Sequence, residues 1–235
     1  ANVGDALAAL KKVVYEDGTI NRDTLAEALS KNWEGYENLR QVMLNQAPKF
    51  GNDDDYADEL ARLAARIYCE EVEKYTNPRG GQFQAGLYPV SANVPFGAAV
   101  GALPDGRLAG TPLADGVSPV SGRDVNGPTA AAKSVAKLDH EIASNGTLFN
   151  QKFLPSALRG ETGHGNLASL VRTYFSLGGM HVQFNVISKE ILREAQQNPE
   201  QYRGLVVRVA GYSAFFTSLD KSLQEDIITR TEHTI

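Results

Sequence analysis

The segment Arg208-Val209-Ala210-Gly211-Tyr212 is the most informative stretch of this 235-residue chain. It follows the apolar run Leu205-Val206-Val207 and precedes Ser213-Ala214-Phe215-Phe216, so the pattern predicts a strand over 205–210 that leads directly into a glycine. A glycine in a surface turn usually has Asn, Asp, Ser or Pro beside it. Because the neighbours here are apolar or aromatic, we expect Gly211 to be buried. Two explanations are open: the glycine allows a close backbone approach or a bulge, or it is itself the reactive group.

The composition is that of a soluble globular protein, with 42% hydrophobic and 22% charged residues and a net charge of −5. The chain has no basic patch or tail, so nucleic acid is not an expected partner. It has no apolar run of about 18 residues, and residues 1–5 do not resemble a signal peptide. We therefore expect neither a membrane span nor secretion.

The single cysteine, Cys69, excludes an internal disulfide and a cysteine-rich metal site, and it fits a reducing cytoplasm. Cys69 lies in an expected helix beside Glu70 and Glu71, which disfavour a reactive thiolate. The histidines are too far apart in the sequence to form an evident metal site: His140, His164, His181 and His233. We interpret the cysteine and the histidines as structural, and we note that the end of a helix at His140 favours a cation.

Residues 1–76 have the apolar periodicity of helices. The pattern predicts helices over 5–16, 22–31, 37–45 and 56–75, with Asn21 as the N-cap of the second. In the last of these the inward face is expected to contain Leu60, Leu63, Ala64, Ile67 and Val72. The acidic run 53–55 is expected to start this helix, because its spacing does not suit a calcium loop.

Residues 77–128 are rich in glycine and proline and form the second segment. One strand is expected over 83–94, and the remainder is expected to form long, packed loops that cover or line a site. Residues 129–235 form the third segment, in which helices are expected over 130–143, 166–176, 189–197 and 221–230, strands over 181–187 and 205–210, and irregular structure over 145–156. This alternation predicts an α/β fold with parallel strands, and three strands are too few to close a barrel.

Several segments, in this order along the chain, resemble the glycyl radical enzymes, the superfamily of pyruvate formate-lyase. A single Arg-Val-x-Gly-Tyr is weak evidence, whereas the ordered set is specific and extends along essentially the whole chain. The segments that carry the resemblance are Pro48–Tyr56, Asn77–Gly81, Tyr88–Gly97, Leu113–Pro119, Asn126–Ala130, Arg208–Tyr212 and Ile227–Thr231.

The resemblance implies that Gly211 stores a radical on its α-carbon. Arg208, Ala210, Tyr212 and Ser213 would support the radical loop. The radical would serve as a protein-derived cofactor, with no other cofactor or metal bound. A radical S-adenosylmethionine activating enzyme with an iron–sulfur cluster would install it. The fold implied is part of an α/β barrel with outer helices, in which a finger loop carries Gly211 inward.

The sequence departs from the family in one respect. The family's catalytic cysteine lies on an upstream loop and is followed closely by a glutamate, but no Gly-Cys-x-Glu occurs here and Cys69 does not match that loop. Family members are also several times longer. The chain therefore resembles the C-terminal, radical-bearing part of a cytoplasmic, anaerobic enzyme that is a homodimer when complete. Alone, without the upstream cysteine-bearing portion or subunit, it is expected to be inactive.

The subfamily is indicated by residues 145–153 and 213–216, which resemble glycerol and propanediol dehydratases and choline trimethylamine-lyase. These enzymes catalyse a 1,2-elimination from a small diol or amino alcohol. Tyr88, Ser91 and Asn93 are candidates for the substrate pocket, although hydrogen bonding within their loop explains them equally well. Three alternatives stay open: a non-catalytic spare radical domain that restores a longer partner, a formate acetyltransferase-like enzyme, and a purely structural α/β protein.

Overall fold

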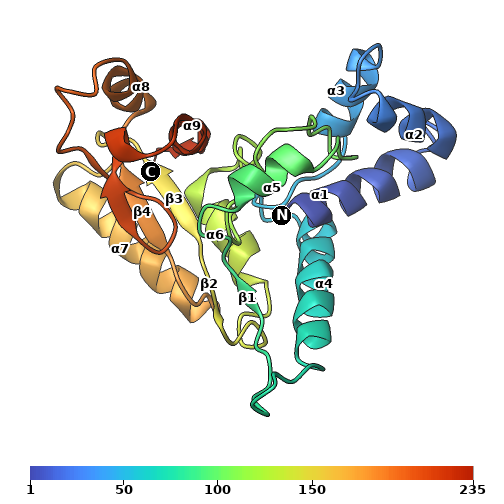
Figure 1. Cartoon of the computed structure of the whole chain (residues 1–235), viewed down its shortest axis with the longest axis horizontal. Coiled ribbons are helices and arrows are strands. Elements are labelled where there is room, and N and C mark those ends of the chain that lie inside the picture. The colour runs from blue at the N-terminus through green and yellow to red at the C-terminus, as the bar shows by residue number, and fades with distance from the viewer. Residues whose placement is uncertain (235) are drawn as a thin grey trace.

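The structure is a computed structural model, and it describes residues 1–234. The helices of the first 72 residues lie on one side of the molecule, and the strands and helices from residue 150 onward lie on the other (Figure 1). The glycine- and proline-rich segment runs between these two parts.

The N-terminal helices follow the predicted pattern closely. Asn21 is the N-cap expected for the second helix, since its side chain accepts a hydrogen bond from the Thr24 amide at 2.8 Å. The first helix continues without a break into a π-helical segment, η1. The elements are α1 (Asn2–Ala9), η1 (Leu10–Glu16), α2 (Arg22–Ser30), α3 (Glu37–Asn45) and α4 (Asp55–Val72).

The inward face expected for α4 is wrong at two of its five residues, whereas Leu60, Ala64 and Val72 are half-buried. Leu63 and Ile67 are 48% and 58% exposed, whereas Ala61 and Cys69 are buried. The reason is the close crossing of α1 and α4: a Cβ on Gly4 would lie 2.7 Å from the Cβ of Ala61. Only small side chains fit at such a contact, so alanines, rather than the larger aliphatic residues, face the neighbouring helix.

The acidic run before α4 starts the helix, as predicted. The Asp54 carboxylate accepts a hydrogen bond from the Tyr56 amide at 2.9 Å. Asp53 and Asp58 both pair with Lys137, at 2.9 and 2.7 Å, and so connect the start of α4 to the end of the next long helix, α6 (Gly127–Ala136).

The strand predicted over 83–94 is largely wrong. Only β1 (Gly86–Leu87) forms there, and Asn93 begins a short helix, α5 (Asn93–Ala99). Pro89 lacks the N–H that a longer strand would need, whereas Pro95 lies in the first turn of α5, where proline is tolerated. The loops that follow are packed, as expected: the buried Arg107 guanidinium donates to the carbonyl oxygens of Gly97 and Gly101 at 2.7 and 2.9 Å.

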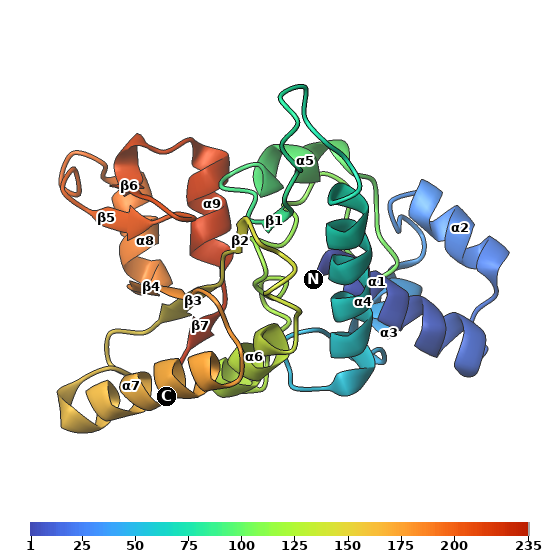
Figure 2. The same ribbon diagram turned by 90° about the horizontal axis from the view of Figure 1, so that it is seen from below.

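The C-terminal part contains the expected helices, and α7 begins six residues earlier than predicted. The helix predicted over 130–143 ends at Ala136. Figure 2 shows this part beside α6. The remaining elements are β2 (Gly146–Thr147), β3 (Asn150–Phe153), α7 (Gly160–Ser176), β4 (Gln183–Val186), α8 (Lys189–Gln197), β5 (Val206–Arg208), β6 (Ser213–Phe215), η2 (Phe216–Ser218), α9 (Lys221–Thr229) and β7 (Glu232–His233).

A three-stranded parallel sheet in the order β4-β3-β7 forms the centre of this part. The parallel arrangement agrees with the predicted α/β class, but β3 lies in the stretch predicted to be irregular. The apolar pattern missed it because Asn150, Gln151 and Lys152 are polar, yet all are buried. Within residues 1–234 the sheets are β4-β3-β7, β1-β2 and the β5-β6 hairpin, and none closes into a barrel.

Two buried clusters hold the C-terminal part together. One joins β3 to α6 and α7 through Phe149, Phe153 and Tyr174. The other lies beneath the β5-β6 hairpin and includes Val207 and Ile227. Over the described range, no helix has both the length and the apolar character needed to cross a membrane.

Candidate functional site

Gly211 lies in the tight connection between β5 and β6. The strands pair antiparallel, with Arg208 opposite Ser213, and the Val209 amide donates to the Tyr212 carbonyl oxygen at 2.9 Å. Gly211 has φ +80°, a backbone conformation that side chains disfavour. Contrary to the prediction that it is buried, Gly211 is exposed among the described residues. Its apolar neighbours Val209 and Ala210 are buried, Val209 within the cluster beneath the hairpin, whereas Gly211 and Tyr212 are exposed.

Two amide side chains of β4 hold the residues around this turn. The Oε1 atom of Gln183 accepts from the Gly211 amide at 3.1 Å and from Arg208 Nε at 2.9 Å. Asn185 pairs with the Arg208 backbone in both directions, accepting from its amide at 2.8 Å and donating to its carbonyl oxygen at 2.7 Å. Residues two apart on a strand share a face, so both amides point toward the hairpin.

A third amide comes from β3. Asn150 is in register with Gln183 on the neighbouring parallel strand, and Gln183 Nε2 donates to Asn150 Oδ1. Asn150 Nδ2 in turn donates to the Val209 carbonyl oxygen at 3.3 Å. The three amides therefore form one buried network that contacts the backbone on the N-terminal side of Gly211.

Arg230, which follows α9, completes the support of the turn. Its Nη1 donates to the Val209 carbonyl oxygen at 2.9 Å, and its Nη2 lies 3.0 Å from Asp226 and 3.4 Å from Asp115. All three charged side chains are buried. Burial raises the pKa of Asp115, and the nearby Arg230 guanidinium opposes that shift. Buried charges of this kind persist when they are paired and hydrogen-bonded.

The residues predicted to support the loop lie in different surroundings. Arg208 and Ser213 meet across the hairpin, with Arg208 Nη1 3.3 Å from Ser213 Oγ. Ala210 is buried, and Tyr212 is 37% exposed. The sequence interpretation missed the six polar residues that hold the turn: Asp115, Asn150, Gln183, Asn185, Asp226 and Arg230. A signal existed for two of them, Gln183 and Asn185, which are amides at alternate positions of a strand that is otherwise apolar.

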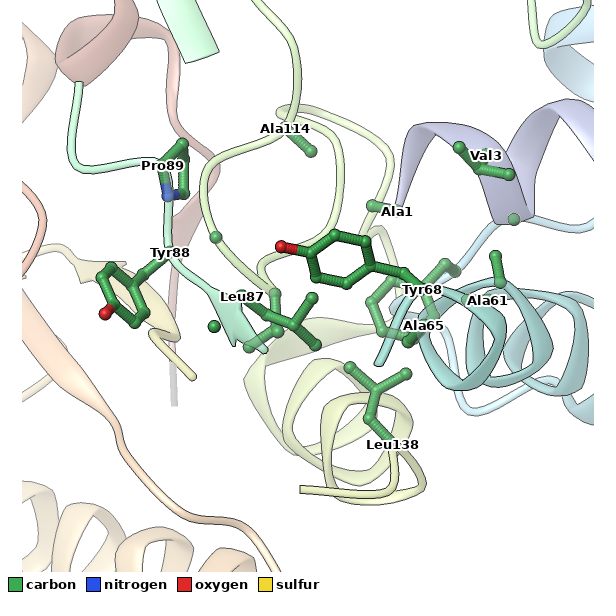
Figure 3. A pocket seen from close by; sticks show the side chains of 16 residues that line it. Ala1, Val3, Ala61, Ala65, Tyr68, Leu87, Tyr88, Pro89, Ala114 and Leu138 are labelled. Carbon is green, nitrogen blue, oxygen red and sulfur yellow. The ribbon is translucent and has the colours of Figure 1, made fainter. Parts of the chain in front are cut away.

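The three candidate pocket residues do not share one pocket. Tyr88 lines a cavity of about 410 Å³, and its hydroxyl bonds to Asn145. Figure 3 shows Tyr88 at one end of the labelled residues, Val3 and Ala61 toward the other end, and Leu87 between Tyr88 and Tyr68. Asn93 is buried elsewhere: its Nδ2 donates to Asp226 Oδ1 at 3.1 Å, so it adjoins the Arg230 cluster. Ser91 lies in the turn before α5 and is partly exposed.

Cys69 and His140 have structural surroundings. Burial raises the pKa of the Cys69 thiol, and the nearby carboxylates of Glu73, Asp139 and Glu70 add to the shift. Both ring nitrogens of His140 are hydrogen-bonded, to the Thr147 hydroxyl and to the Val135 carbonyl oxygen, each at 2.8 Å. Burial lowers the pKa of His140, so the cation favoured by its place at a helix end does not form near neutral pH.

In the part of the chain that the structure describes, no three His, Cys, Asp or Glu side chains are placed together so that they could hold a metal ion.

The chain resembles known proteins over nearly its whole length. Residues 113–217 match the family model described as Glycine radical, and residues 1–97 match the one described as Pyruvate formate lyase-like. A structure of the B12-independent glycerol dehydratase from Clostridium butyricum is 61% identical with a TM-score of 0.98, covering 100% of this chain and 30% of that one.

Two further relatives also match the chain over nearly its whole length. A structure concerned with 1,2-propanediol dehydration in Roseburia inulinivorans is 56% identical with a TM-score of 0.96, covering 99% of this chain and 30% of that one. A probable dehydratase of Escherichia coli, YbiW, is 50% identical in an alignment 242 positions long that covers 99% of this chain and 30% of that protein. The chain thus spans about 30% of the length of these relatives.

Proposed function

We propose that this chain, which belongs to the glycyl radical enzyme family, is the radical-bearing part of a lyase or dehydratase. In this proposal Gly211 stores the radical. The observation that carries the proposal is the Gly211 turn, in which a glycine with φ +80° is held through its own amide at the tip of a hairpin. The match of residues 113–217 to the Glycine radical model supports a protein-derived radical as the cofactor.

Glycine suits this role for a physical reason. Removal of one hydrogen atom from its α-carbon leaves an unpaired electron, and the centre can become planar because no side chain blocks it. The adjacent amide nitrogen donates electron density and the carbonyl withdraws it, so the spin is spread along the backbone. We propose a radical S-adenosylmethionine enzyme as the separate activating protein that removes this hydrogen atom.

The stored radical would act through a thiol. Gly211 would regain a hydrogen atom from the S–H of a cysteine, which leaves a thiyl radical on the sulfur. Cys69 is unsuited to this step, because it is buried in α4, on the other side of the molecule from the hairpin that carries Gly211. We propose that the thiol belongs to polypeptide outside these 235 residues, which would also complete the barrel and enclose Gly211 as an inward finger.

We propose a 1,2-elimination as the reaction of the complete enzyme. The thiyl radical takes a hydrogen atom from one substrate carbon, water or an amine leaves the neighbouring carbon, and the product radical recovers a hydrogen atom from the thiol. Glycerol, propane-1,2-diol and choline are the candidate substrates, and the relatives named for glycerol and 1,2-propanediol support the diols. The same proposal includes the division into segments 1–76, 77–128 and 129–235, a homodimer, and a substrate pocket completed by polypeptide outside this chain. Tyr88, Ser91 and Asn93 would contribute to that pocket, although they line no common cavity within the described residues.

An activity assay tests this function. The complete polypeptide that contains this chain is activated anaerobically and offered each of the three substrates, and aldehyde formation is measured. We expect an aldehyde product from at least one diol and none from Gly211→Ala. Turnover by Gly211→Ala at the wild-type rate would contradict the proposal.

A second assay distinguishes this function from the alternative that the chain is a replacement radical domain for a longer partner. The isolated 235-residue chain is added to a longer homologue whose radical glycine has been replaced. Restored turnover would favour a replacement radical domain, whereas we expect the isolated chain to restore nothing.

A further inference from the structure

We propose that Gln183 is a positioning residue for the Gly211 radical, acting through its hydrogen bond with the Gly211 amide. The inference rests on the proposed radical function and assigns the side chain that sets the geometry of the radical. Gln183 lies on β4, 28 residues before Gly211, and is 7% exposed.

The hydrogen bonds of Gln183 fix the orientation of its amide. Oε1 faces two donors, the Gly211 amide at 3.1 Å and Arg208 Nε at 2.9 Å. Nε2 faces two acceptors, Asn150 Oδ1 and the Val209 carbonyl oxygen, the latter at 3.5 Å. A rotated amide would place donor against donor and acceptor against acceptor, so only one orientation satisfies all four partners.

The same network restrains the peptide that precedes Gly211. The Val209 carbonyl oxygen accepts from Arg230 at 2.9 Å and from Asn150 at 3.3 Å. Two residues further on, Gln183 accepts a hydrogen bond from the Gly211 amide. When the α-carbon becomes planar, the nitrogen side of Gly211 is therefore held, and the adjustment must occur on the carbonyl side toward Tyr212. Preorganised support of this kind determines how precisely a reactive group is placed.

The hydrogen bond also affects the radical electronically. Spin delocalisation draws electron density from the amide nitrogen, which makes its N–H a stronger donor. A buried acceptor in a surrounding of low polarity then stabilises the radical more than the resting glycine. The hyperfine coupling to the Gly211 nitrogen reports both effects, because it depends on the orientation of the amide and on its share of the spin.

The test compares three variants in the complete, anaerobically activated polypeptide, with ¹⁵N-glycine incorporated and the signal recorded by electron nuclear double resonance. Gln183→Leu removes the acceptor, and Gln183→Glu makes it anionic. Gln151→Leu is the matched control, because Gln151 is equally buried on β3 but donates to the Pro128 carbonyl oxygen at 3.0 Å instead.

We expect the ¹⁵N coupling to fall in Gln183→Leu, to rise in Gln183→Glu, and to stay at the wild-type value in Gln151→Leu. We also expect the radical in Gln183→Leu to decay about fivefold faster, the factor that one net hydrogen bond contributes. An unchanged coupling in either Gln183 variant, with a normal wild-type signal, would overturn the role of Gln183 and leave the radical function intact. Absence of a glycine signal in the wild-type protein would overturn the radical function itself, and the inference with it.

Discussion

Arg230 donates a hydrogen bond from Nη1 to the carbonyl oxygen of Val209 at 2.9 Å. A side chain that follows the last helix thereby holds the backbone two residues before Gly211. The same guanidinium pairs with Asp226 one turn earlier in the chain and approaches Asp115 from the loop region. The Arg230 guanidinium therefore joins the hairpin turn to α9 and to the loop before α6.

Replacement of Arg230 is expected to be strongly destabilising. Arg230→Met leaves two buried carboxylates without their cation, and the expected loss in free energy of unfolding is about 3–5 kcal/mol. Denaturant unfolding measures it. Arg193→Met is the control, since Arg193 pairs with Glu225 on the exposed side of α8, where such pairs contribute about 0–1 kcal/mol. Equal losses in the two variants would contradict the structural role assigned to Arg230.

Replacement of Gly211 by alanine is expected to have a small cost in stability, apart from its effect on the radical. The residue has φ +80°, and an added Cβ would lie 3.2 Å from Leu148 Cδ1. The expected loss is about 1–2 kcal/mol, the usual cost of a left-handed conformation for an L-residue. Gly204→Ala is the matched control, because a Cβ there meets nothing within 4 Å and the residue has no positive φ. Equal urea midpoints in the two variants would contradict the predicted backbone strain at Gly211.

The helices could be predicted from the sequence because their signals are local. The predicted range of α8 is confirmed residue by residue, and Asn21 and Asp54 cap helices as their side chains indicate. The inward face of α4 could not be predicted in this way. It depends on how closely α1 approaches, and that distance is set by Gly4 and Ala61, which lie far apart in the sequence.

The candidate site could be predicted only in part. The segment around Gly211 was found from its motif, whereas the network that holds it was missed. Asn150 and Gln183 read as irregular or unremarkable polar residues, because their role depends on the parallel pairing of β3 with β4. The burial of Gly211 was inferred from its apolar neighbours, whereas within these 235 residues Gly211 is exposed, and we propose that polypeptide outside them encloses it.

Asn93 is expected to contribute to stability through Asp226. Its Nδ2 donates to the buried Asp226 carboxylate and to the Leu113 carbonyl oxygen at 3.3 Å. Asn93→Ala is expected to lower the free energy of unfolding by about 1–3 kcal/mol, because a buried charged acceptor loses a donor. Ser91→Ala, in the neighbouring turn, is expected to stay within about 0.5 kcal/mol of the wild type. A loss in Ser91→Ala as large as that in Asn93→Ala would contradict this assignment.

His140 is expected to make stability depend on pH below about 6.5. Burial lowers its pKa in the folded chain, although the bond to Val135 and the Asp139 carboxylate oppose the shift. In the unfolded chain the imidazole takes up a proton near pH 6.5. The unfolded state therefore binds more protons between the two pKa values, and the free energy of unfolding falls as pH decreases through that interval.

The pH series is measured on two histidine variants. In His140→Gln the contribution of this histidine to the slope between pH 6.5 and acid conditions should be lost. His181, whose pKa burial lowers, and Asp5, whose pKa burial raises to about 7, continue to contribute with opposite signs. In His164→Gln, an exposed position, the wild-type slope should remain. A wild-type slope in His140→Gln would contradict the assignment.

The most direct test of the central claim is electron paramagnetic resonance of the complete polypeptide after anaerobic activation, with unlabelled and α-deuterated glycine incorporated. The account predicts a doublet from the single remaining α-hydrogen, which collapses on deuteration and is absent in Gly211→Ala. A doublet that persists in Gly211→Ala, or the absence of any glycine-derived signal in the activated wild-type protein, would contradict it.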